Sequence, residues 1–183
     1  MEKNTTNKKP EFLEYVYKLN EGIELSEALT LSLQKIDVVD IAQLNSIGFK
    51  TYEKRKWTVH KILQHLIDWE RIWCYRAITF ARKEGTIPEA QDQEIMGENS
   101  NADELSIEQL INELRLVRQS TIMMFDSFNK KILETNCAFF EYEMPLFAIG
   151  FTITAHQIHH FKIIQEKYIP LAKYITRWTL TRR

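Results

Sequence analysis

Residues that interrupt helices are rare in this chain, which holds only 5 Gly and 4 Pro among 183 residues. Sandwiches and barrels of β-strands need turn-forming residues at short intervals, so this composition disfavours both architectures. In several long segments, apolar residues instead recur three or four positions apart, the spacing that places side chains on one helix face. The chain length suits one domain with a sizeable core. These features predict an all-α fold, a four-helix bundle.

Four segments are expected to form the helices of the bundle. They are residues 25–44, a segment that begins at Thr58 and stops at Gly85, a segment from Ser106 to about Asn129, and a segment from Pro145 to Tyr168. Thr58 is an acceptable N-cap for the second helix. Ser106 is followed three residues later by Gln109, a capping-box pattern that marks the start of the third helix.

The connections and the two ends of the chain complete the predicted organisation. Residues 85–105 would form a long crossover loop, or a lid, between the second and third helices, because bundle connections are usually much shorter. Residues 15–20 are compatible with either a short helical turn or an extended arm. We therefore expect an N-terminal arm over residues 1–22, the bundle over residues 23–170, and a C-terminal tail over residues 171–183 that packs on it.

The charge balance and the apolar segments exclude several classes of partner. The 24 basic and 25 acidic side chains nearly cancel, so no global field favours nucleic acid. No stretch approaches the roughly 20 apolar residues of a membrane span, and the polar start of the chain does not resemble a secretory signal. We expect a cytoplasmic protein. Cys74 and Cys137 are then expected to be free thiols, without an assigned role.

Two histidines near the end of the chain have the spacing of a metal site. His156 and His160 are four residues apart, which turns both imidazoles to the same helix face within about 40 degrees. They continue the line of Ile149 and Ile153, which points toward the bundle interior. Unpaired imidazoles would be costly there, and a metal ion removes that cost. A core histidine that is merely hydrogen-bonded is the alternative for each residue alone.

His65 of the second helix is the candidate third ligand, because it lies beside apolar residues on the same stripe. Three histidines leave a coordination position open for water or substrate, as in catalytic zinc sites. Gln157 occupies the position of the glutamate in an HExxH motif, so zinc-protease chemistry is not expected. His60 lies off this face and is expected to be solvated.

Three further residues near the histidines are candidates for an outer shell of the site. Asp68 and Glu70 are close to His65 in sequence, and either carboxylate could orient a ligating imidazole. A salt bridge or a solvated position is an equally weighted alternative for each. His159 is about 100 degrees away from His160 around the helix, so we interpret it as an outer-shell or surface residue.

The sequence resembles the DinB/YfiT-like superfamily of metal-dependent four-helix bundles. The resemblance is carried by residues 56–59 and 65–70, by residues 75–77 and 81–82, by the acidic run 91–94, by the region of Arg118, and by residues 155–161. It spans roughly residues 25–168. It implies that His65, His156 and His160 bind one divalent metal ion and that the bundle forms a homodimer. Three imidazoles suit zinc, nickel, copper or iron, of which zinc or nickel is favoured.

The resemblance also bears on function, because superfamily members include transferases and isomerases that use low-molecular-weight thiols. It implies a metal-dependent transferase, or a related hydrolase or isomerase, whose partners are a small thiol and a small electrophile. Arg76 and Arg118 could bind an anionic group or form salt bridges. A non-catalytic dimeric bundle with a structural or vestigial metal is the alternative. The sequence identifies no catalytic residue beyond the metal ligands.

Overall fold

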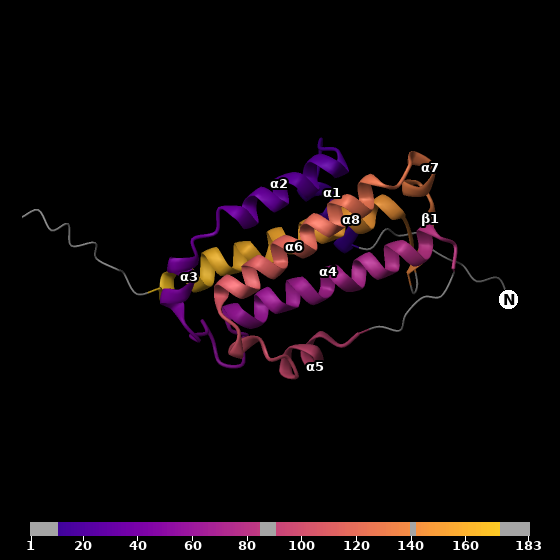
Figure 1. Ribbon diagram of the computed structural model, residues 1–183. Helices are drawn as coiled ribbons and strands as arrows, with labels where there is room; N and C mark the ends of the chain where they lie inside the picture. The colour runs from indigo at the N-terminus through magenta and orange to yellow at the C-terminus, as the bar shows by residue number, and fades with distance from the viewer. Residues whose placement is uncertain (1–10, 85–90, 140–141, 173–183) are drawn as a thin grey trace, which may run out of the picture.

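The computed structural model describes residues 11–84, 91–139 and 142–172. Its four long helices lie side by side (Figure 1), and they are α2 (Leu25–Asp37), α4 (Val59–Ala81), α6 (Ile107–Asp126) and α8 (Leu146–Ile163). Both α2 and α4 contact α6 and α8, which closes the bundle. The predicted four-helix bundle is therefore confirmed. Within the described ranges, no helix has the length and apolar character that a membrane span requires.

Shorter elements lie at both ends and along one side of the bundle. They are α1 (Glu11–Leu19), α3 (Ile41–Ile47), α5 (Gln93–Glu98), a 3-10 turn (Ala102–Glu104), α7 (Lys130–Leu133), strands β1 (Asn136–Phe139) and β2 (Tyr142–Pro145), a π-helix (Ile164–Tyr168) and a second 3-10 turn (Ile169–Leu171). The two strands pair antiparallel, with Cys137 opposite Met144. Helix α1 packs on α8, and α5 packs on α4.

The helix starts lie where the capping residues place them. The Thr58 hydroxyl accepts a hydrogen bond from the Lys61 backbone N–H at 3.2 Å. At α6, the Ser106 hydroxyl accepts from the Gln109 N–H at 3.1 Å, and the Gln109 side chain accepts from the Ser106 N–H at 2.8 Å. Both caps satisfy backbone donors that have no partner within the helix. Pro145 is the N-cap of α8 rather than its first helical residue.

The structure corrects one predicted helix and adds elements that were not predicted. The segment 25–44 is not continuous, because Asp40 begins a new helix by accepting a hydrogen bond from the Gln43 N–H at 2.9 Å. Residues 15–20 belong mostly to the helix α1 and not to an extended arm. The segment 85–105 contains α5 and a 3-10 turn in its described part. The C-terminal tail from residue 173 lies outside the described residues.

The core consists of two apolar clusters with polar side chains between them. One cluster, which includes Leu63 and Ile111, fills the end of the bundle near α3. The other, which includes Leu29 and Ile149, fills the end near the β-hairpin. Between the two, all four long helices contribute to a buried polar layer made of Ser32, Glu70, Arg118, Thr121 and Gln157. The polar layer lies next to the histidines of α4 and α8 in sequence.

Candidate metal centre

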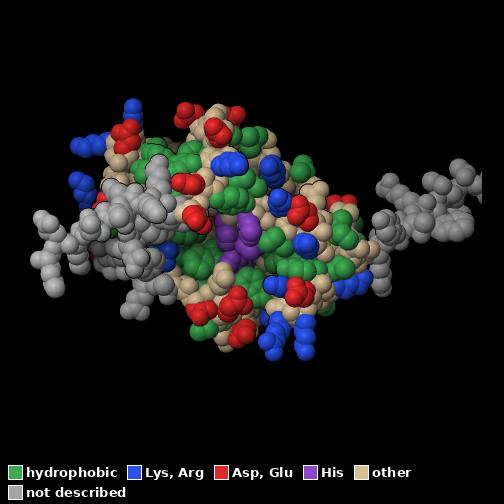
Figure 2. Space-filling view, turned by 180° about the vertical axis from the view of Figure 1, so that it is seen from behind, with side chains coloured by type: hydrophobic (Ala, Val, Ile, Leu, Met, Phe, Trp, Pro, Cys, Tyr) green, Lys and Arg blue, Asp and Glu red, His purple; other side chains and the backbone are tan. Residues whose placement is uncertain are grey.

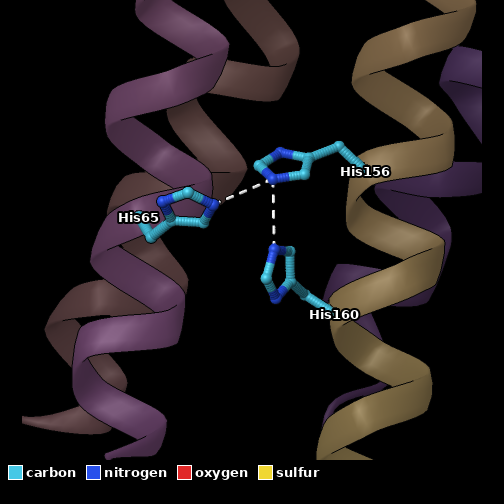
Figure 3. A group of neighbouring side chains, drawn as sticks. All are labelled: His65, His156 and His160. Atoms are coloured by element: carbon cyan, nitrogen blue, oxygen red, sulfur yellow. Dashed lines mark hydrogen bonds between the residues drawn. The ribbon is translucent and has the colours of Figure 1, made fainter. Parts of the chain in front are cut away.

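The rings of His65, His156 and His160, here called the histidine triad, meet between α4 and α8 (Figure 3). The Nε2 atom of His65 lies 2.9 Å from the Nε2 atom of His156, and the Nε2 atom of His160 lies 3.1 Å from that same atom. One nitrogen from each ring lies within 4.8 Å of the other two. The fold thus brings together the three residues that the sequence predicts as metal ligands.

The chemistry of this donor set fits a divalent metal ion. A neutral imidazole has one nitrogen with a lone pair, so the Nε2 atom of His156 can accept a hydrogen bond from only one of its two neighbours. Nitrogens that bind zinc at 2.0–2.1 Å in tetrahedral geometry lie about 3.3 Å apart. The two observed separations of 2.9 and 3.1 Å are within a few tenths of an ångström of that value. To hold an ion in this geometry, these two separations would widen by a few tenths of an ångström.

Burial keeps the histidine triad neutral at physiological pH. Desolvation lowers the pKa of His65 to about 4 and the pKa of His160 to about 3. The pKa of His156 is also lowered well below its usual value, first by burial and then by repulsion from the neighbouring histidines. An imidazole binds metal only in its neutral form. The site therefore presents ligand-ready nitrogens without first losing protons.

Aromatic side chains surround the histidine triad on the α4 side. The ring centroid of Trp57 lies 4.9 Å from that of His65, and the ring centroid of Trp69 lies 5.9 Å from it. Figure 2 shows the histidines at the floor of a hollow, with hydrophobic side chains around them. The centre is therefore reachable from one face of the molecule, and its surroundings are apolar.

A comparison with protein families identifies the fold. The sequence model of the DinB superfamily matches residues 25–164. The chain belongs to the DinB superfamily. The matched region begins at the first residue of α2 and contains all four long helices and the whole histidine triad. No curated protein matches this chain in sequence.

One solved structure resembles this DinB-superfamily protein. YfiT from Bacillus subtilis aligns with a TM-score of 0.61 and 15% sequence identity, over 90% of each chain. It is described as "a probable metal-dependent hydrolase with an unusual four-helix bundle topology". At this low identity the likeness establishes the shared fold alone.

The polar layer holds the two histidine-bearing helices of this DinB-superfamily protein together. Arg118 donates to both carboxylate oxygens of Glu70, at 2.8 and 2.9 Å, and to the Gln157 side-chain oxygen at 2.7 Å. It also hydrogen-bonds to the Ser32 hydroxyl. Glu70 accepts a further bond from the Thr121 hydroxyl at 2.7 Å. Because Gln157 follows His156 directly, this network fixes α8 close to a predicted ligand.

The three outer-shell candidates lie in different surroundings. Glu70 forms the buried ion pair with Arg118, so its hydrogen bonds go to the polar layer and not to a histidine. Asp68 accepts a hydrogen bond from the Gln64 amide at 2.8 Å. His159 is exposed, and its ring centroid lies 5.1 Å from that of His160. An orienting role for Asp68 or His159 stays a prediction.

His60 is buried, which corrects the expectation that it is solvated. Only 6% of its surface is exposed, because the ring of Phe49 stacks on it at a centroid distance of 4.7 Å. Burial lowers the pKa of His60, although nearby Asp103 acts in the opposite direction. His60 is not part of the histidine triad. Its burial depends on a loop residue that helical periodicity does not place.

Sequence reasoning missed most of the polar layer, although a signal was present. Arg118 follows Leu114 by four residues and so lies on the apolar stripe of α6. Ser32 occupies a similar position on α2, between Leu29 and Ile36. A polar residue on an apolar stripe needs buried partners, so several such residues at one level of a bundle indicate a network.

Proposed function

We propose that this protein is a metal-dependent enzyme in which the histidine triad binds one divalent ion, zinc or nickel first among the candidates. The observation that carries the proposal is the convergence of three Nε2 atoms, contributed by two helices, in a partly buried pocket. The pKa values of His65 and His160 are far below 7, so both rings carry lone pairs that can bind a cation at neutral pH.

The chain's own residues have two roles in this proposal. His65, His156 and His160 hold the ion, and the rings of Trp57 and Trp69 limit the access of water to it. An ion held by these three imidazoles would supply a nucleophile at neutral pH, because it would lower the pKa of a bound water or thiol. Either nucleophile would attack a small electrophile.

The reaction class follows from the choice of nucleophile. With a low-molecular-weight thiol, the enzyme would be a thiol-dependent transferase or isomerase, and with water it would be a hydrolase. The description of YfiT as a probable hydrolase supports the second class. The aromatic rings around the histidine triad support the first, because they shield a thiolate from solvent. We also propose a cytoplasmic homodimer.

The first experiment measures metal content. Protein purified without a nickel column and without chelators should contain close to one zinc or nickel ion per chain by elemental analysis. His65→Ala, His156→Ala and His160→Ala should each lose that metal while circular dichroism shows an intact bundle. Metal content that is unchanged in all three variants would refute the assignment of the histidine triad.

The second experiment tests catalysis on the metal-loaded protein. A panel of thiols with alkyl halide or epoxide acceptors tests the transferase, and a panel of esters and amides tests the hydrolase. The turnover should disappear on chelation and return on addition of the native metal. Bound metal without turnover on any panel would favour a non-catalytic bundle with a structural ion.

A further inference from the structure

A cavity of about 200 Å³ opens directly beside the histidine triad. Its walls come from three segments that are distant in sequence: the loop that precedes α4 together with the start of α4, the start of α5, and the end of α8 with its π-helix. His160 belongs both to the cavity wall and to the histidine triad. A molecule in this cavity would therefore lie against one member of the histidine triad.

Specific contacts fasten the loop wall of this cavity to the end of α8. The Tyr168 hydroxyl donates a hydrogen bond to the backbone carbonyl of Trp57. The ring of Tyr168 meets the ring of Tyr52 edge to face, at a centroid distance of 5.2 Å. The Lys50 ammonium donates to the Leu171 carbonyl at 2.7 Å. The cavity is thus a built feature that joins the two segments.

The backbone departs from regular geometry at two places around the cavity. Arg55 has φ of 68°, in the left-handed region that non-glycine residues rarely occupy. The stretch Ile164–Tyr168 is a π-helix, which brings Tyr168 into the cavity wall. Both features cost free energy, and both are found preferentially at functional sites.

The charged residues on the cavity wall give it a positive balance. Arg55 and Lys56 lie on the loop wall, and Glu94 lies on the α5 wall, so two positive charges and one negative charge leave a balance of +1. Across the described part of the chain, none of these three residues takes part in an ion pair. Arg55 and Lys56 are both exposed, and the Lys56 ammonium lies 6.0 Å from the centroid of the Tyr52 ring. A contact with a ring face leaves the N–H groups able to donate, so both residues keep donors available for a ligand.

We propose that this cavity holds the anionic group of a small substrate, such as a carboxylate, while the reacting end of the same molecule lies at the histidine triad. The inference rests on the proposed function, because it makes the cavity a subsite of that centre. Arg55 and Lys56 attract and hydrogen-bond the anion, the aromatic rings of Tyr52 and Trp57 contact its carbon chain, and Glu94 weakens the attraction.

The test compares mercaptopropionate with its methyl ester, which has the same thiol and carbon chain but no negative charge. Binding is followed by NMR, through the backbone amide signals of residues 52–57 in isotope-labelled protein, for the metal-free and the zinc-loaded protein. The variants are Lys56→Gln, Arg55→Asn and Glu94→Gln. Asn tolerates left-handed backbone, so it removes the charge without new strain. Lys54→Gln is the matched control, because Lys54 is exposed and does not line the cavity.

The expected result is a preference for the acid over the ester of roughly tenfold, in line with charge-assisted hydrogen bonds. Lys56→Gln and Arg55→Asn should each reduce that preference by roughly threefold, Glu94→Gln should increase it, and Lys54→Gln should leave it nearly unchanged. Equal affinities for acid and ester, or an equal loss in Lys54→Gln and Lys56→Gln, would overturn the proposal.

Elemental analysis of the same samples separates this inference from the proposed function. If the wild-type chain fails to bind zinc, the proposed enzyme is refuted, and the metal-free titration still decides whether the cavity prefers anions. If zinc binds and the acid shows no advantage over the ester, the metal centre stands and the anionic subsite is refuted.

Discussion

Arg118 of α6 and Glu70 of α4 form a two-point ion pair in the middle of the bundle, with nitrogen–oxygen distances of 2.8 and 2.9 Å. The two side chains are only 1% and 3% exposed. Glu70 lies five residues after His65 on the same helix, and Gln157, another partner of Arg118, lies beside His156. Arg118 therefore links the two helices that carry the histidine triad, α4 through the ion pair with Glu70 and α8 through the hydrogen bond to Gln157.

Replacing Arg118 by Met should strongly destabilise the fold, because it leaves the Glu70 carboxylate buried without its cation. Breaking a buried pair in this way costs about 3–5 kcal/mol. Arg115→Met is a matched control on the same helix, since Arg115 pairs with Asp37 at 2.6 Å near the surface, and it should cost under about 1 kcal/mol. Urea denaturation measures both, and equal losses would contradict a structural role for the buried pair.

His160→Ala should weaken metal binding far more than His159→Ala, although the two residues are neighbours. His160 contributes a nitrogen to the histidine triad, whereas His159 is exposed. Loss of a direct ligand should lower zinc affinity by at least about a hundredfold, more than the loss of an outer partner. Competition with a zinc-binding dye measures the affinities. Similar losses of zinc affinity in both variants would contradict His160 as a direct ligand of the ion.

The metal-free protein should lose stability as the pH falls below about 6.5. In the folded state the pKa is about 4 for His65 and about 3 for His160, so between these values and 6.5 the unfolded chain binds more protons than the folded one. Over that range, each histidine then lowers the free energy of unfolding by up to about 1.4 kcal/mol for each pH unit of acidification. Urea denaturation from pH 7 to pH 4 measures it.

A shallower pH dependence is expected for metal-free His160→Gln, because one titrating group is removed. Saturating zinc should raise the stability of the wild-type protein near pH 7 and lose that effect on acidification, as protons compete for the same nitrogens. A wild-type stability that is independent of pH between 6.5 and 4 would contradict the low pKa values of the histidine triad.

Gly97→Ala should disturb the packing of α5 against the loop before α4. A methyl group on Gly97 would lie 2.9 Å from the Trp57 atom Cζ2, which is closer than van der Waals contact allows. Overpacking of this kind costs about 1–3 kcal/mol, and the helix preference for alanine over glycine, about 1 kcal/mol, offsets only part of that range. The variant should be less stable in urea. Trp57→Phe in the same chain should recover part of the loss, because it removes the clashing atom.

The bundle was predictable because its signals are local. The capping residues Thr58 and Ser106 give the starts of α4 and α6, and apolar spacing gives the buried face of each long helix. The histidine spacing on α8 indicated a shared face, and His65 could be selected because it lies on the stripe of α4. The likeness to a known superfamily then supported the same three histidines as metal ligands.

Features that depend on contacts between distant segments were not predictable. His60 is buried by Phe49, which belongs to an irregular connection. Glu70 pairs with Arg118, a residue 48 positions away, whereas a salt bridge and an orienting role for Glu70 had equal weight from the sequence alone. The hairpin of β1 and β2 has strands of four residues each, too short to show a clear alternation of polar and apolar side chains.

The 91 positions that separate His65 from His156 give metal binding a consequence for folding. An ion coordinated by both would act as a cross-link between distant parts of the chain, comparable to a disulfide that closes a long loop. Such a link restricts the unfolded ensemble more than the native state, and the effect grows slowly with loop length. Metal supply would then set the lifetime of the folded protein as well as its chemistry.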